Sequence, residues 1–398
     1  MSEWLSTNIG AICQKVVSGG TPLTSNHDYY KNGGIPWLKT KEVNQSRIYS
    51  TENHITQLGL DNSSAKLIPV NSVVIAMYGD GKTAGRVGLT KIPLATNQAC
   101  CNLIFDENKT HAEFVFYYLL GSYDELVARK TGSGQQNLNA QLIKAFEIPL
   151  PSLSEQKAIA SVLSSLDDKI DLLHRQNTTL ERMAETLFRQ WFVEEAQENW
   201  EECTLNDLIS VKGGTTPSTK ELSFWNGNVN WTSPRDLSNQ QSVFMFDTER
   251  KITEKGLAQI GSGLLPVGTV LMSSRAPIGY LAISDIPVAI NQGYIAIICD
   301  KLVSNYFMYL WCKVNMEQIK NSGNGSTFEE ISKSNFKALL AVRPPKQVLE
   351  NFHQKVEPMF RKVKCNQQQI KTLEKLRESL LPKLMSGEIT VELGEINE

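Results

Sequence analysis

Apolar residues recur in two long segments of the chain at alternating steps of four and three residues, the pattern of a helix that buries one seam. Each segment begins at a proline-rich exit, "IPLPSLSEQ" in the first and "RPPKQVLEN" in the second. At 1.5 Å per residue, each helix would be about 50 Å long. The two seams consist of Ile159, Leu163, Leu166, Ile170, Leu173, Asn177, Leu180, Ala184, Leu187 and Trp191, and of Phe352, Val356, Met359, Val363, Asn366, Ile370, Leu373, Arg377, Leu380 and Leu384.

A single amphipathic helix of this length cannot bury its seam alone, so we expect the two segments to pair with each other. An approximate two-fold axis across the pair would make the helices antiparallel. Charge agrees weakly with this pairing, since residues 154–199 carry 5 basic and 9 acidic side chains and residues 346–398 carry 9 and 8. Asn177 and Asn366 are interpreted as polar core positions that fix the register.

The remainder of the chain consists of two copies of one unit. Matching landmarks occur in the same order. "VSGGTP" and "VKGGTT", Trp37 and Trp231, and "IPLATNQ" and "IPVAINQ" are 194 positions apart, whereas "LIPVNSVVIA" and "LLPVGTVLMS" are 197 apart. Short β-type runs broken by Gly, Asn and Pro precede one helical run in each copy. We therefore predict an α+β fold of two duplicated mixed α/β domains, at 1–152 and 200–345, separated by two long helices at 153–199 and 346–398 that form an antiparallel coiled coil with pseudo-two-fold symmetry.

Composition limits the classes of function. The 398 residues carry a net charge of −2, and the seven cysteines form no CxxC pair, so no metal or other cofactor is expected. The sequence contains no apolar run of about 18 residues that would span a membrane, and its N-terminus lacks the pattern of a secretion signal. We expect a cytoplasmic protein with reduced thiols.

The stretch "AMYGDGKTAGR" at 76–86 resembles a phosphate-binding loop but departs from one in three ways. Ala76 stands where the motif requires glycine, no helix is predicted to begin after the loop, and the duplicate has the shorter "MSSRAPIG". The serine esterase, metalloprotease and dinucleotide-binding motifs are likewise missing. The chain is expected to be non-catalytic; a nucleotide hydrolase built on "GDGKT" would instead show turnover that is lost on Lys82→Ala.

The chain resembles the specificity subunit of a type I restriction-modification system. The matching features are the repeated "GGTP…PW" opening, the "TNQ" and "INQ" steps, the exit "IPLPSLSEQKAIASVLSSLDDKID", and the helix ends "LERMAETLFRQWF" and "LEKLRESLLPKLMSGEI". The resemblance implies two target-recognition domains that each read one half of an interrupted double-stranded DNA site. It further implies spacer helices that dock methyltransferase subunits, two per chain, with restriction subunits joining through the complex. The second exit, "RPPKQVLE", departs from the family pattern and leaves its contacts open.

Residues identical in both copies cannot distinguish two different half-sites, so they are interpreted as architectural. These are Gly19-Gly20-Thr21 with Gly213-Gly214-Thr215, Trp37 with Trp231, and Asn97-Gln98 with Asn291-Gln292. The two "NQ" steps are interpreted as core residues whose polar groups are hydrogen-bonded within the domain. DNA contacts are expected in loops where the copies differ in polar or cationic content. The candidates are Lys39, Thr40, Lys41, Tyr78, Lys82, Arg86 and Gln135 in the first copy, and Ser233, Arg235, Ser273, Ser274, Arg275 and Asn324 in the second.

Apolar residues off the helical seam need cover. The recognition domains would cover part of this surface, and the remainder is the expected docking surface for two methyltransferase subunits, formed by Leu172, Met183, Phe188 and Phe192. Residues 1–153 carry 13 basic and 12 acidic side chains and residues 200–345 carry 13 of each, so partner subunits are expected to supply much of the phosphate neutralisation. A pseudo-dimeric scaffold that binds protein only is the alternative, and it predicts no sequence preference in a selection from random duplexes.

Overall fold

The computed structural model describes residues 4–79, 81–130, 137–238, 242–275, 277–323 and 330–391. The chain divides into two compact units, Met1–Ile170 with Leu373–Glu398, and Asp171–Thr372. Each unit combines one globular domain with a stretch of both long helices, α6 (Leu153–Arg189) and α13 (Lys346–Met385). The predicted domain limits at 152/153 and 345/346 lie just before these helices, whereas the compact units divide within them.

The first unit is built on a five-stranded sheet with the order β2-β9-β6-β7-β4, in which β4 is parallel to β7 and the other neighbours are antiparallel. The continuous apolar run "VVIA" forms β6 and is buried along its length, as expected of a central strand. The elements are β1 (Leu5–Asn8), α1 (Ile9–Ile12), β2 (Cys13–Ser18), β3 (Ile35–Leu38), β4 (Ser46–Ile48), β5 (Asn53–Ile55), α2 (Gln57–Asp61), β6 (Val73–Ala76), β7 (Val87–Thr90), β8 (Ala95–Thr96), β9 (Cys100–Phe105), α3 (Ala112–Gly121), α4 (Tyr123–Ala128), α5 (Ala140–Lys144) and β10 (Glu147–Leu150). Two smaller sheets, β5-β3-β8 and β1-β10, complete the domain.

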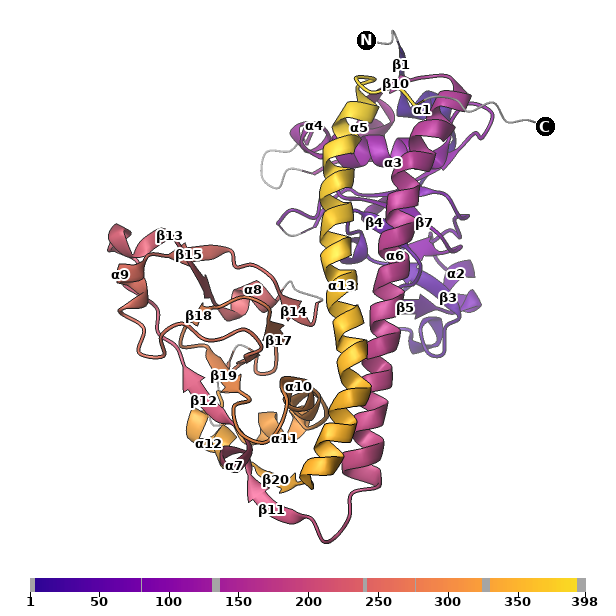
Figure 1. Cartoon of the computed structure of the whole chain (residues 1–398). Helices are drawn as coiled ribbons and strands as arrows, with labels where there is room; N and C mark the ends of the chain where they lie inside the picture. Colours follow the sequence, from indigo (N-terminus) through magenta and orange to yellow (C-terminus); the bar gives the residue numbers. More distant parts are fainter. Residues whose placement is uncertain are drawn as a thin grey trace, which may run out of the picture. The chain divides into compact units, whose positions relative to one another are not determined.

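The second unit repeats this topology strand for strand. Its sheets have the orders β12-β19-β16-β17-β14, β15-β13-β18 and β11-β20. The elements are β11 (Glu201–Thr204), α7 (Leu205–Leu208), β12 (Ser210–Gly213), β13 (Trp225–Thr232), α8 (Pro234–Ser238), β14 (Phe244–Met245), β15 (Arg250–Ile252), α9 (Glu254–Leu257), β16 (Val270–Ser273), β17 (Leu281–Ser284), β18 (Ala289–Ile290), β19 (Tyr294–Ile298), α10 (Asn305–Val314), α11 (Met316–Asn321), α12 (Lys333–Lys337) and β20 (Leu340–Arg343). The duplication predicted from the sequence is confirmed (Figure 1).

At the glycine turns, the residues that are equivalent in structure are offset by one from the residues that are identical in sequence. Gly20 N donates to Thr96 O at 2.8 Å, and in the second unit Thr215 N, not Gly214 N, donates to Ile290 O at 3.0 Å. The segment from this turn to the buried tryptophan is one residue shorter in the second copy, which shifts the identical "GGT" letters out of register. The structural counterparts of Gly19-Gly20-Thr21 are therefore Gly214-Thr215-Thr216.

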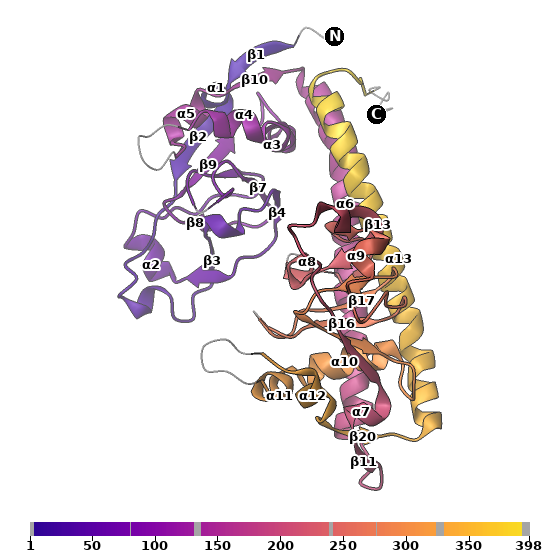
Figure 2. The ribbon, with the colours of Figure 1, turned by 90° about the vertical axis from the view of Figure 1, so that its left-hand side faces the viewer.

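The long helices are antiparallel within each unit, as the expected two-fold relation of the duplicated units predicts. In the first unit Arg377 of α13 binds Asp167 of α6, with Nη1 and Oδ1 2.6 Å apart. In the second unit Asn366 Nδ2 donates to Asn177 Oδ1 at 2.9 Å. Positions thus fall along α13 as they rise along α6, and Figure 2 shows the two helices side by side. After Arg189, α6 ends in a π-helical turn over Gln190–Glu194. Among the helices of the described residues, none has the length and apolar character needed to cross a membrane.

Candidate nucleic-acid interface

Loops that are far apart in the sequence meet at the end of the central strand in each unit. In the first unit, Met77 N donates to Ala99 O at 2.8 Å and Leu138 N donates to Met77 O at 2.9 Å. The second unit has the same two bonds, from Ser274 N to Gly293 O at 2.8 Å and from Ile331 N to Ser274 O at 3.0 Å. The loop after β6 or β16 therefore lies between the "NQ" step and the segment that precedes the last short helix.

A further loop joins this place through the parallel pairing of β3 with β8 and of β13 with β18. Asn97 N donates to Leu38 O at 2.9 Å, and Asn291 N donates to Thr232 O at 3.0 Å. Because parallel strands end at the same edge, the residues that follow each pair emerge together. We call the resulting surface the loop edge; it comprises residues 39–42, 77–79, 81–86, 97–99 and 137–138 in the first unit, and 233–236, 274–275, 277–280, 291–293 and 330–331 in the second.

The sequence-predicted cations after β3 lie on the loop edge of the first unit. Lys39 is half-buried, with Nζ 3.2 Å from Asn53 Oδ1 and 5.2 Å from the centre of the Trp37 ring. Thr40 begins a 3₁₀ turn, Thr40–Glu42. Lys41 is exposed and forms an ion pair with Glu52 at 2.8 Å, a hydrogen bond that raises the pKa of Lys41. Lys39 is therefore held by the protein, whereas Lys41 can exchange its exposed carboxylate partner for another anion.

The loop between β6 and β7 supplies two more cations. Lys82 is exposed, and no acidic side chain among the described residues pairs with it. Arg86 is half-buried and donates from Nη1 to Asn44 Oδ1 at 3.0 Å. Tyr78 is half-buried and packs against the core of the first unit, which leaves only part of its ring on the surface.

This loop does not have the geometry of a phosphate-binding loop. It joins β6 to the antiparallel strand β7, so no helix N-terminus follows the glycines to meet an anion. Residues 77–86 are three more than the equivalent 274–280, as the sequence comparison indicated. Gly85 has φ +90°, and a Cβ there would lie 2.6 Å from Val127 Cγ2. Gly85 therefore serves the close turn of the backbone into β7.

On the loop edge of the second unit, the two candidate arginines lie at the surface. Arg235 has a side chain that is 79 % exposed, with Nε 4.0 Å from a carboxylate oxygen of Glu249. Arg275 Nη1 lies 3.7 Å from a carboxylate oxygen of Glu330. Both ion pairs are loose and solvent-exposed, so each contributes little to stability.

The candidate serines of the second unit serve the loop itself. Ser273 is fully buried, and its hydroxyl donates to Pro277 O at 2.7 Å and accepts from Tyr280 N at 2.8 Å. Ser274 is also buried, while Ser233 is half-buried and its backbone N donates to Asp236 Oδ2 at 2.8 Å. Burial removes the Ser273 and Ser274 side chains from the residues we propose for DNA contact. Gln135 and Asn324 lie outside the described residues.

The residues expected to be architectural divide into two groups. Trp37 and Trp231 are buried, and a Cβ on Gly19 would lie 2.1 Å from Asn97 O, so these positions hold the fold together. The side chains of Gln98 and Gln292 are exposed, contrary to the expectation that they belong to the core.

A buried polar network in the first unit joins the globular domain to both long helices. Tyr117 Oη donates to Asp167 Oδ2 at 2.7 Å, and Arg377 binds the other oxygen of that carboxylate. Arg47 of β4 pairs with Asp168 and donates from Nη2 to Ser164 O at 3.3 Å. Burial, followed by the charge of Asp167, raises the pKa of Tyr117. The network therefore attaches sheet and α3 to the coil through charge and hydrogen bonds.

The second unit makes the equivalent attachment with aromatic rings. Phe360, which follows the seam residue Met359 as Asp167 follows Leu166 in the other copy, stacks on Tyr306 with ring centres 4.6 Å apart. Tyr309 lies 5.8 Å from the same ring and Phe244 6.5 Å. An ion pair between Lys364 and Asp285, at 2.5 Å, flanks the cluster.

The exits into the two helices also differ, as the departing "RPPKQVLE" indicated. Gln156 is fully buried, and its Oε1 accepts from Thr110 Oγ1 and His111 N, both at 2.9 Å. Its Nε2 donates to Pro151 O at 2.9 Å. In the second unit Leu349 belongs to the apolar core instead.

The four predicted docking residues fall into two environments within the second unit. Leu172 and Met183 are 40 % and 48 % exposed on α6. Phe188 and Phe192 are 1 % and 7 % exposed, because their rings pack against Phe307 and Phe352. The aromatic pair is therefore part of the core and not an open surface.

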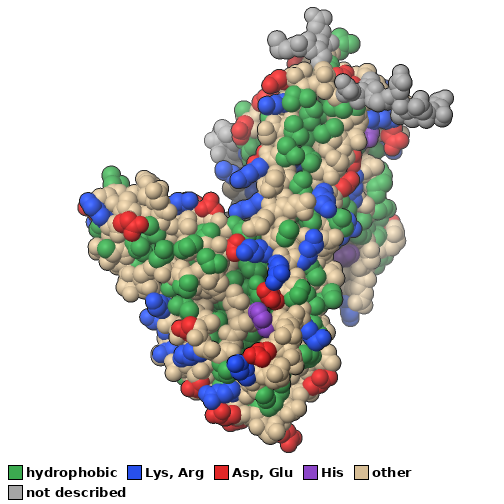
Figure 3. All heavy atoms as spheres, in the orientation of Figure 1, with side chains coloured by type: hydrophobic (Ala, Val, Ile, Leu, Met, Phe, Trp, Pro, Cys, Tyr) green, Lys and Arg blue, Asp and Glu red, His purple; other side chains and the backbone are tan. Residues whose placement is uncertain are grey.

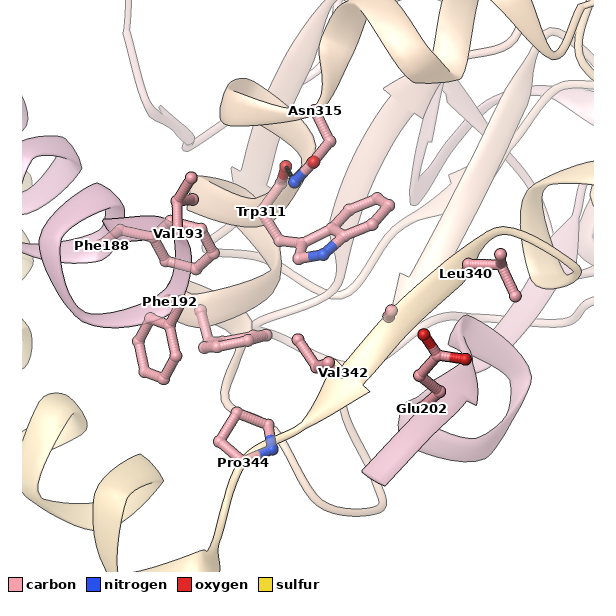
Figure 4. Close-up of a pocket in the computed structure, with 11 residues that line it drawn as sticks. Phe188, Phe192, Val193, Glu202, Trp311, Asn315, Leu340, Val342 and Pro344 are labelled. Atoms are coloured by element: carbon pink, nitrogen blue, oxygen red, sulfur yellow. Dashed lines mark hydrogen bonds between the residues drawn. The ribbon is translucent and has the colours of Figure 1, made fainter. Parts of the chain in front are cut away.

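Phe188 and Phe192 nevertheless line one side of a pocket of about 260 Å³ (Figure 4). Trp311 and Val342 line it from α10 and β20. At the surface, Val193 is 55 % exposed and Leu340 is 69 % exposed. The sequence gives no sign of these two residues as a pair, since they are distant in the chain and have no periodic pattern.

Charge and cysteine placement add no further site. On the face shown in Figure 3, Lys and Arg side chains lie among Asp and Glu side chains. No group of three or more His, Cys, Asp or Glu residues suited to a metal occurs in the described parts of the chain. The seven cysteines form no disulfide, and burial raises the pKa of Cys13 to about 12.

Comparison with known proteins gives a consistent result. The family model described as the type I restriction modification DNA specificity domain matches residues 1–182 and again 197–375. The chain is 28 % identical to the type I restriction enzyme MjaIX specificity subunit of Methanocaldococcus jannaschii, over 98 % of this chain and 97 % of that one. It is 23 % identical to the HindI specificity subunit of Haemophilus influenzae, over 70 % and 77 %. The crystal structure of the S subunit from M. genitalium shares the fold, with a TM-score of 0.61, 17 % identity and 96 % coverage of each chain.

Proposed function

Because the chain belongs to the family of type I restriction-modification DNA specificity domains, we propose that it is the DNA-recognition subunit of a type I restriction-modification complex. It carries no catalytic activity of its own in this proposal. Methyltransferase subunits, two per chain, act on the DNA that it selects, and restriction subunits join through the complex.

Each unit reads one half of an asymmetric, interrupted site through its loop edge. The observation that carries this proposal is the repeated geometry of the loop edge on diverged side chains. Four chain segments meet through matched backbone bonds in both units, while cations stand at Lys82 and Arg86 in one and at Arg235 and Arg275 in the other. Two domains that bind different DNA sequences require the same backbone arrangement with different polar side chains on its loops.

The candidate residues divide by chemistry. Arg86, Arg235 and Arg275 present planar guanidinium groups that can grip guanine edges in a bidentate manner. Lys41 and Lys82 are exposed point charges suited to phosphate oxygens. The remaining accessible candidates, Lys39, Thr40, Tyr78 and Ser233, are half-buried and help to hold their loops in place.

The helix pair sets the gap between the two halves of the site. Both α6 and α13 are uninterrupted helices that contribute residues to each unit. A stiff pair of helices converts helix length into a fixed number of base pairs, and two linked readers gain affinity from their effective concentration.

Exposed apolar residues of the second unit form the proposed docking surface for one methyltransferase subunit. They are Leu172 and Met183 on α6, and Val193 with Leu340 beside the pocket. Phe188 and Phe192 support this surface from below. The near-neutral charge of each domain implies that the partner subunits supply cations to the duplex, so the chain alone should bind weakly and with a shallow salt dependence.

The test is to co-express the chain with its methyltransferase subunits and to map the methylated positions on random duplexes. We expect a two-part site in the wild type. Lys82→Ala with Arg86→Ala should alter the preferred bases of one half, and Arg235→Ala with Arg275→Ala those of the other half. Absence of any sequence preference in the wild-type complex would favour the protein-only scaffold.

A further inference from the structure

Gln98 and Gln292 occupy the same place on the two loop edges and are both exposed. In each unit the side-chain carbonyl is held by a threonine hydroxyl of the neighbouring glycine turn. Thr21 Oγ1 donates to Gln98 Oε1, and Thr216 Oγ1 donates to Gln292 Oε1 at 2.7 Å. Both copies therefore retain a surface side chain together with the group that orients it.

The turn that carries the threonine is itself fixed. Gly20 N and Thr215 N donate to the carbonyls of Thr96 and Ile290, directly before each "NQ" step. Close packing leaves no room at the preceding glycine, where a Cβ on Gly214 would lie 1.8 Å from Ile290 O. Trp37 Nε1 donates to Gly20 O at 3.0 Å and closes the arrangement from the core side.

Holding Oε1 leaves the Nε2 amide directed away from the threonine. No described residue accepts a hydrogen bond from Nε2 of Gln98 or Gln292. Each glutamine thus presents two N–H donors at the surface. The adjoining loops meet on either side of it, since Asn97 N donates to Leu38 O and Met77 N to Ala99 O.

Identity between the copies excludes a role in choosing between two different half-sites. For a buried residue identity would indicate architecture, but packing does not require an exposed glutamine. Both half-sites share the sugar-phosphate backbone, whose oxygens accept hydrogen bonds. A bidentate grip on adenine would need Oε1 and Nε2 to face the base together, whereas the threonine hydroxyl takes one lone pair of Oε1 and turns this oxygen toward the glycine turn.

We propose that Gln98 and Gln292 each donate from Nε2 to one backbone phosphate of the half-site beneath them, and thereby fix the register at which the diverged loops meet the bases. This inference rests on the proposed function. The Thr21 and Thr216 hydroxyls are positioning groups, because they hold the amide in the orientation that donates outward.

The experiment measures binding of the complex with its methyltransferase subunits to a duplex with the mapped site and to a scrambled duplex. Gln98→Ala and Gln292→Ala should each weaken binding to both duplexes by about three- to tenfold, with an unchanged ratio between them. The effects of the two substitutions should multiply. Gln98→Glu, which is isosteric, should weaken binding further than Gln98→Ala, and the excess should shrink as salt rises.

Neutral methylphosphonate substitution, one phosphate at a time, locates the contact. Substitution of one phosphate in the first half-site should weaken binding of the wild-type complex but should leave binding of the Gln98→Ala complex unchanged. Gln292→Ala should show the same behaviour at one phosphate of the other half-site. Thr21→Val should give a smaller loss at the same phosphate. A matched control is Gln57→Ala, at an exposed glutamine on α2 outside the loop edge, which should leave binding unchanged.

Two results would overturn the inference. One is unchanged binding in both alanine variants, and the other is a loss confined to the mapped site, which would make these residues base readers. Thermal unfolding of the variants identifies any loss caused by misfolding, and in that case the Gln98→Glu salt dependence decides. A wild-type complex without sequence preference would instead refute the proposed function, and the methylphosphonate pattern would still report on the glutamines.

Discussion

Asn366 Nδ2 donates to Asn177 Oδ1 at 2.9 Å in the buried seam between α13 and α6. Asn177 is 5 % exposed and Asn366 is fully buried. Both residues occupy seam positions, which apart from Arg377 are otherwise filled with apolar side chains. The same amide nitrogen also lies 3.3 Å from Gln176 Oε1. A buried amide pair of this kind specifies one alignment of two helices, because any other register would leave both groups without partners.

Replacement of this pair should show a strong coupling. Asn177→Leu alone should lower the free energy of unfolding by about 1–3 kcal/mol, since the Asn366 amide would lose its main partner in the core. The double change to leucine should be as stable as the wild type or more stable, because it removes both polar groups. Chemical unfolding of the four proteins of this cycle provides the measurement, and additive effects would contradict the pairing.

The Tyr117–Asp167–Arg377 network should be a main attachment of the first domain to the coil. Tyr117→Phe removes one donor to a buried carboxylate and should lower the free energy of unfolding by about 1–2 kcal/mol. Arg377→Met should cost about 2–4 kcal/mol, because Asp167 would remain buried with its charge less compensated.

The matched control for the network lies in the other copy. Tyr309 is buried against Phe360, and burial followed by the charges of Glu181 and Glu185 raises its pKa. Because no carboxylate of the described residues accepts a hydrogen bond from its hydroxyl, Tyr309→Phe should change stability less than Tyr117→Phe. Equal effects of the two substitutions, measured by urea unfolding, would show that ring burial and not the carboxylate bond sets the cost.

Gln156 should be required at the first exit, whereas the second exit uses leucine at the corresponding place. Gln156→Leu would leave Thr110 Oγ1, His111 N and Pro151 O without their partner, and we expect a loss of about 2–3 kcal/mol in the free energy of unfolding. Leu349→Ala in the second unit should cost a similar amount by a different cause, the loss of apolar packing. Hydrogen exchange should localise the first effect to the start of α6; protection there that stays unchanged would contradict this role.

His111 should make the first unit sensitive to mild acid. Burial lowers the pKa of His111 from the ordinary 6.5, and the charge of Glu113 opposes this shift. The charges of Lys157 and Lys91 lower the pKa of His111 further. As pH falls below about 6.5, the folded state therefore binds fewer protons than the unfolded state. The stability that neutral His111 contributes is complete above this pH and is lost as pH falls through the lowered pKa of the folded state. His111→Gln should flatten the pH dependence of unfolding between pH 7 and 5, and an unchanged pH dependence would contradict this role.

The sequence predicted the helix pair well because a seam of ten positions in each helix leaves few alternatives. The duplicated landmarks likewise predicted matched domains, and the strand orders agree. Of these landmarks, only the glycine turns were aligned one residue off. The segment between the turn and the buried tryptophan is one residue shorter in the second copy, and this difference is evident from the backbone hydrogen bonds but not from the identical "GGT" residues.

The details of the site depended on contacts between distant residues. Asp167 next to a helical seam ordinarily indicates a solvated charge, and its burial follows from Tyr117 and Arg377, which lie 50 and 210 positions away. The sequence predicts that Phe188 and Phe192 are available for docking, but Phe307 of the same unit covers them. The exposure of Gln98 could not be predicted either, because identity between copies is equally consistent with a core residue and with a contact to a shared ligand.

The central claim is that the helix pair measures the distance between two half-sites, and insertion of one heptad into both helices tests it most directly. The insertion points are between Ile170 and Asp171 and between Thr372 and Leu373, where the two units divide. They face each other in the antiparallel register set by Asn177 with Asn366 and by Asp167 with Arg377.

Seven residues lengthen a helix by about 10.5 Å, which corresponds to about three base pairs at 3.4 Å each. Methylation mapping of the complex should therefore show the same two half-sites separated by a gap about three base pairs wider. A gap of unchanged width, or half-sites of altered sequence, would contradict the account.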